Sequence, residues 1–106
     1  MLDFKTIPKD RKFYVIRSGR DYAIYGHTDE TDGTKLVCLF SDLRKVMRFQ
    51  EERDLHGTVT LSMKWSEILA GFPKTFKGGL LDWSSDDAHD IHQGFMFADL
   101  PETAAH

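Results

Sequence analysis

The segment KFYVIRSGRDYAIYGH (residues 12–27) decides the fold class, because two runs rich in aromatic and β-branched residues flank a short SGR turn. This pattern predicts a β-hairpin with Gly19 in the tight turn. A polar turn that contains Asp-Gly follows at residues 28–34. KLVCLF (residues 35–40) then predicts a third strand, which is central because it is apolar on both faces. The chain therefore begins with three strands in a meander.

Two segments further along have the apolar spacing of amphipathic helices. Ser41 is the expected N-cap of the first helix, at about residues 42–52. A strand at TVTLSM (residues 58–63) precedes the second helix, which should end near Gly71 and Pro73. The apolar stripes are Leu43, Val46, Met47 and Phe49 in the first helix, and Trp65, Ile68, Leu69 and Phe72 in the second. We interpret both stripes as parts of the core.

The last third of the chain adds two short strands, GGLLDW (residues 78–83) and GFMFADL (residues 94–100), on either side of a short helix. Strands lead and helices are interspersed later. This order predicts an α+β fold: a mostly antiparallel sheet of five to six strands, with two to three helices packed on one face. Residues 1–106 should form a single domain, since 106 residues suffice for one core.

Composition excludes several classes of protein. Hydrophobic residues make up 41% of the chain and the net charge is −3, as in folded globular proteins. No run approaches the roughly 18 apolar residues of a membrane span, and the first residues contain no secretory signal, so we expect a cytoplasmic protein without membrane contact. The single cysteine, Cys38, cannot form an internal disulfide and is expected to be a buried core residue.

The segment LLDWSSDDAHDIHQGF (residues 80–95) carries four aspartates and two histidines. His89 and His92 are three residues apart, so on a helix they lie on one face and could bind one ion together with Asp86 or Asp82. This arrangement is the basis of one hypothesis, a metal-dependent enzyme or a metal-binding protein.

Helix capping explains more of the same segment. Ser84 or Ser85 would cap a short helix, Asp86 and Asp87 would complement its dipole, and Gly94 would end it. We therefore expect no metal and no cofactor. The sequence also contains no phosphate-binding loop, no GxSxG elbow and no CxxC pair, so we expect no enzymatic activity.

Basic residues gather on the first predicted helix, at Arg44, Lys45 and Arg48. Glu51 and Glu52 follow directly, and the whole chain is acidic. A solvated helix face therefore explains the basic residues better than a nucleic-acid surface.

Charge asymmetry favours protein interaction. An acidic segment and a basic helix can attract each other within one chain, between two copies, or toward another protein. We expect the partner to be another protein, or a second copy in a homodimer. The predicted interaction surface consists of Asp82, Trp83, Asp86, Asp87 and Asp90, with Arg44, Lys45 and Arg48 as the opposing charge.

The succession LVCLFSDLRKVMRF, VTLSMKWSEILAGFP and GGLLDW, within Leu36 to Trp83, is similar to the layout of SseB-type (enhanced serine sensitivity protein) domains. Where that family tends to show Asn-Pro after the glycine-led strand, this chain has Asp82 and Trp83. The resemblance implies a small α+β domain that acts through protein contacts in bacteria or their phages, without catalytic residues. The working hypothesis is a non-enzymatic interaction or regulatory domain, of the immunity or adaptor type.

Overall fold

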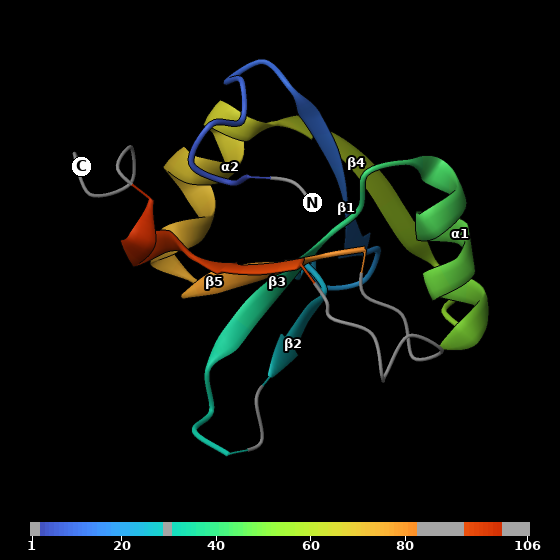
Figure 1. Ribbon diagram of the computed structural model, residues 1–106. Helices are drawn as coiled ribbons and strands as arrows, with labels where there is room; N and C mark the ends of the chain where they lie inside the picture. Colours follow the sequence, from blue (N-terminus) through green and yellow to red (C-terminus); the bar gives the residue numbers. More distant parts are fainter. Residues whose placement is uncertain (1–2, 29–30, 83–92, 101–106) are drawn as a thin grey trace.

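The computed structural model describes residues 3–28, 31–82 and 93–100 (Figure 1). The elements are β1 (Lys12–Ser18), β2 (Gly26–Thr28), β3 (Lys35–Leu39), α1 (Leu43–Glu52), β4 (Thr58–Lys64), α2 (Trp65–Gly71), the 3₁₀ helix η1 (Phe72–Lys74), β5 (Gly78–Leu81), β6 (Gln93–Met96) and the 3₁₀ helix η3 (Phe97–Asp99). The predicted α+β class is confirmed.

The strands form two sheets. β1 pairs antiparallel with β4, and a second sheet has the order β2-β3-β5-β6, in which β3 and β5 run parallel. Single bridges from Tyr14 to Phe40 and from Arg17 to Ile24 connect the two sheets. The prediction of one sheet is therefore wrong, whereas the pairing is mostly antiparallel as predicted, with β3–β5 as the parallel pair. The connection from β3 to β5 through α1, β4 and α2 is long enough to bring β5 back in the direction of β3.

A turn follows β1 where the sequence predicted it, but β1 pairs along its length with β4 and is joined to the following segment by the single Arg17–Ile24 bridge, so the predicted meander of the first three strands is wrong. Ser18 N–H donates to the carbonyl oxygen of Ala23 at 2.8 Å. The residue with a positive φ is Tyr22 (φ 60°), not Gly19. Gly19 instead allows the backbone to approach Gly57 closely, because a Cβ at residue 19 would clash with the carbonyl oxygen of Gly57.

Two core clusters lie on either side of β1 and β3. The larger cluster consists of Ile7, Phe13, Val15, Val37, Leu39, Trp65, Ile68, Leu69, Phe76, Leu81, Phe97 and Leu100. The smaller consists of Ile16, Cys38, Phe40, Val46 and Phe49. Successive residues of a strand point to opposite faces, so Val37 and Leu39 join one cluster while Cys38 and Phe40 join the other.

The two helices consequently cover different faces of the strands. α2 supplies Trp65 to the larger cluster, and α1 supplies Val46 to the smaller one. Figure 1 shows α1 and α2 on different sides of β1 and β3. The expectation that the helices pack on one face is therefore wrong. Since β3 is apolar on both faces, it needs cover on both.

Helix α2 agrees with its predicted apolar stripe. Trp65, Ile68 and Leu69 are buried, and the helix passes into η1 at Phe72, where Pro73 follows. The Trp65 ring is 1% exposed and packs edge-on against Phe13, with ring centroids 5.6 Å apart. The larger core is thus built around this tryptophan.

Helix α1 departs from its prediction in two respects. Its N-cap is Asp42, whose carboxylate accepts a hydrogen bond from Lys45 N–H at 3.0 Å, so the prediction of Ser41 is wrong. Val46 and Phe49 are buried, but Leu43 and Met47 are 51% and 57% exposed. Only two of the four residues in the predicted apolar stripe of α1 are therefore buried in the core.

Candidate functional site

Asp82 connects the end of β5 to the start of α1. Its backbone adopts a positive φ of 57°, and its N–H donates to the carbonyl oxygen of Leu39 at 2.8 Å. One carboxylate oxygen accepts from Ser41 N–H at 2.7 Å. The other accepts from the Ser41 hydroxyl at 2.7 Å and from Lys45 Nζ at 3.0 Å. A single side chain thereby ties three segments of the chain together.

This cluster brings together two residues that the sequence placed on opposing surfaces. The Asp82 side chain is 17% exposed and that of Lys45 is 48% exposed, so the ion pair is partly shielded from water. Of the attraction predicted between the acidic segment and the basic helix, the described residues contain the Asp82–Lys45 pair, which forms within one chain. A metal ion at Asp82 would have to compete with the donors from Ser41 and Lys45.

The remaining basic residues of α1 face outward. Arg48 Nε donates to Glu52 Oε1 at 3.1 Å, and the Arg48 side chain is 50% exposed. Arg44 is exposed, and its side chain has no hydrogen bond or ion pair within the described residues. α1 therefore presents Arg44, whose side chain is unpaired within the described residues, and Arg48, which is half-exposed and paired with the mostly covered Glu52.

Leu43 and Met47 lie one helical turn apart, next to Arg44 and Arg48 at the same spacing. We call these four residues the outer α1 surface. Shallow hollows lie at its two ends. One, of about 440 Å³, is lined by Tyr14, Ser41, Asp42, Leu43 and Arg44, and the other, of about 340 Å³, by Met47, Gln50, Glu51, Asp54, Leu55 and His56.

The exposed apolar residues of this surface were missed, because the sequence placed Leu43 and Met47 in the core. A signal was present in the helical rotation of about 100° per residue. Val46 and Phe49 point in one direction, whereas Leu43 and Met47 are rotated toward Arg44 and away from that direction. The apolar residues of α1 therefore spread over a wider part of the helix circumference than the small core cluster beneath it can cover.

Several predicted site residues lie outside the described residues. They are Trp83, Asp86, Asp87, His89, Asp90 and His92. The hypothesis of a metal site at His89 and His92 with Asp86 therefore stays a prediction. Among residues 3–28, 31–82 and 93–100, no three His, Cys, Asp or Glu side chains are grouped so that they could hold a metal ion. In the same ranges, neither helix is long and apolar enough to cross a membrane.

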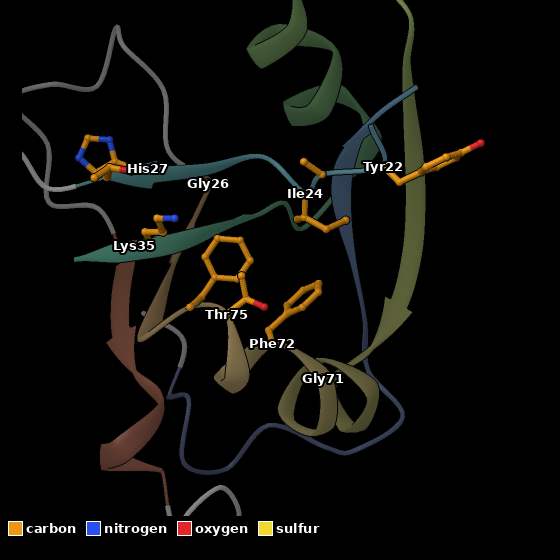
Figure 2. A pocket seen from close by; sticks show the side chains of 11 residues that line it. Tyr22, Ile24, Gly26, His27, Lys35, Gly71, Phe72 and Thr75 are labelled. Atoms are coloured by element: carbon orange, nitrogen blue, oxygen red, sulfur yellow. The ribbon is translucent and has the colours of Figure 1, made fainter. Parts of the chain in front are cut away.

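A separate open hollow of about 620 Å³ lies between the β2–β3 hairpin and the α2–η1 turn (Figure 2). It is lined by Tyr22, Ala23, Ile24, Gly26, His27, Thr28, Lys35, Gly71, Phe72, Thr75 and Phe76. None of them was a predicted site residue. They come from three distant stretches of sequence that carry no common motif, so pattern reasoning had no means of grouping them.

The fold and its surfaces define the chain as an α+β domain. No protein-family model matches it, and no curated protein matches it. The resemblance to SseB-type domains accordingly stays a prediction.

Proposed function

We propose that this chain is a small non-enzymatic interaction domain, of the immunity or adaptor type, that binds another protein through the outer α1 surface. The observation that carries the proposal is the exposure of Leu43 and Met47, by 51% and 57%, on adjacent turns of one helix. Large apolar side chains that are exposed together on a folded domain are typical of interaction sites. A bacterial or phage origin is the part of the proposal that rests on the SseB-type resemblance.

The charges beside this apolar pair indicate the chemistry of the partner. The Arg44 side chain is exposed and unpaired within the described residues, and Arg48 lies one turn further along, half-exposed beside its partner Glu52. Arginine binds carboxylates with two parallel hydrogen bonds, which adds geometric specificity. We therefore expect an apolar patch with acidic residues beside it on the partner.

The Asp82 cluster supports this role by fixing the position of α1. Asp82 contacts both Ser41, just before the helix, and Lys45, in its first turn. A binding surface on an element held in this manner loses little conformational entropy when the partner binds. Lys45 thus contributes by positioning the helix, while Arg44 and Arg48 face the partner.

A photo-crosslinking experiment tests the proposal. A photoreactive phenylalanine analogue at Met47 is expected to capture a specific protein in cells that produce the chain naturally, and Leu43→Glu should abolish the product. The matched control is the same analogue at Val59, which is 37% exposed on β4. A second copy of the chain as the product would identify a homodimer through the same surface.

The proposal fails if the products from Met47 and Val59 are the same, or if Leu43→Glu leaves the Met47 product unchanged. Circular dichroism of Leu43→Glu establishes that the variant is folded. Because Leu43 is exposed, we expect its free energy of unfolding to change by no more than about 0.5 kcal/mol.

A further inference from the structure

The hollow between the β2–β3 hairpin and the α2–η1 turn has the size of a small-molecule site. Its volume of about 620 Å³ falls within the range of typical ligand pockets. Figure 2 shows Ile24 and Phe72 pointing toward one another from opposite walls, with His27 and Lys35 at one end. The lining thus has an apolar middle and a polar, basic end.

Aromatic rings form one wall of this hollow. Phe72 and Phe76 pack edge to face, with ring centroids 5.8 Å apart. Phe76 lies close to the backbone of β2, since a Cβ at Gly26 would lie 2.6 Å from its ring. Gly26 therefore allows the sheet and the aromatic pair to approach, and leaves a wall suited to a flat ring.

The charge at the other end is positive. Lys35 is exposed on β3, and its side chain forms no hydrogen bond or ion pair within the described part of the chain. None of the lining residues is acidic, and the hydroxyl groups of Thr28 and Thr75 add hydrogen-bond donors. An anionic group on a ligand would therefore meet complementary charge at Lys35.

We propose that this hollow binds a small aromatic carboxylate. Its ring would lie against Phe72 and Phe76, and its carboxylate would accept hydrogen bonds from Lys35 Nζ. The site shares no residue with the outer α1 surface, so it goes beyond the proposed function and can be tested separately.

The first test is an NMR titration of the ¹⁵N-labelled full chain with 1-naphthoate. The amide signals of Gly26 and Gly71, which line the hollow, should shift, whereas those of Gly33 and Gly57, outside it, should not. The neutral analogue 1-naphthalenemethanol should bind more weakly. Lys35→Met should weaken naphthoate binding roughly three- to fivefold, as expected for an exposed ion pair, with Lys12→Met as the charge-matched control.

A second variant tests whether naphthoate binds inside the hollow. A Cβ at Gly71 meets nothing within 4 Å, and the φ of −101° suits any residue, so this position accepts a side chain, and Gly71→Leu is designed to occupy part of the hollow. It should weaken naphthoate binding at least about tenfold, whereas the neighbouring Ala70→Leu, outside the hollow, should not. The proposal is overturned if Gly26 and Gly71 do not shift at millimolar naphthoate, if Gly71→Leu binds normally, or if the neutral analogue binds equally well.

Discussion

Helices α1 and α2 have the same kind of apolar spacing but different roles. The seven-residue α2 buries Trp65, Ile68 and Leu69, while the ten-residue α1 buries Val46 and Phe49 and exposes Leu43 and Met47. A helical apolar stripe thus shows which residues are available for burial. How many are buried depends on the surface against which the helix packs.

The two core clusters against which α2 and α1 pack differ in how many segments of the chain contribute to them. The larger core receives Ile7 from the segment before β1 and Leu100 from the segment after η3, so α2 is covered from several directions. The smaller core holds α1 mainly through Phe49, whose ring packs against Phe40 at 5.1 Å. We infer that α2 is structural and that α1 is free to present a surface.

The largest expected effect on stability is the loss caused by truncating the buried tryptophan of α2, which we compare with truncation of an exposed methionine on α1. Trp65→Ala should lower the free energy of unfolding by about 3–5 kcal/mol, because it removes the buried ring that contacts Phe4, Phe13 and Phe95. Met47→Ala should change it by no more than about 0.5 kcal/mol. Urea denaturation followed by circular dichroism measures both. Similar losses for the two variants would break the comparison between the helices.

The second prediction tests whether the smaller core is closed to water. Cys38 is 2% exposed, which confirms its predicted burial, and burial raises the pKa of its thiol from 9.0 to about 11. Below pH 9 the thiol is protonated in both states. Between about pH 9 and 11 the unfolded chain releases the proton and the folded chain keeps it, so stability falls as pH rises.

The full loss attributable to Cys38 is about 3 kcal/mol above pH 11, from a pKa raised by about two. Other groups titrate in this range, so the measurement is the difference in pH profile between the native chain and Cys38→Val. Unfolding by urea at pH 8, 9, 10 and 11 provides it. Parallel profiles for the two proteins would show that the core beneath α1 admits water.

The sequence predicted the helices and strands of the described residues more accurately than their arrangement. Alternating and helical apolar patterns are local, so β4, α1 and α2 lie close to the expected positions. Strand direction and helix side depend on contacts between distant residues. KLVCLF correctly indicated burial on both faces, but not that Cys38 and Phe40 would face α1 while Val37 and Leu39 face α2.

The predicted site could be anticipated in part. Charge patterns indicated an attraction between the acidic segment that begins at Asp82 and the first helix, and among the described residues Asp82 and Lys45 form an ion pair within one chain. Sequence spacing carries no information on the hydrogen bonds from Ser41 that complete this cluster, since Ser41 and Asp82 are brought together by the parallel pairing of β3 and β5. The same serine was consequently mistaken for the cap of α1.

The smallest expected effect concerns that cap and sharpens the comparison at the start of α1. Asp42→Ala should lower the free energy of unfolding by about 1 kcal/mol, because Lys45 N–H loses its acceptor, and Asp42→Asn should restore most of this loss. Amide hydrogen exchange separates the cap from its neighbour. Exchange at Lys45 should quicken in Asp42→Ala but not in Ser41→Ala, which loses only the hydrogen bond from the Ser41 hydroxyl to Asp82. Faster exchange in Ser41→Ala alone would assign the cap to Ser41. In that case the residue that caps the helix would also be the one whose hydroxyl ties it to Asp82.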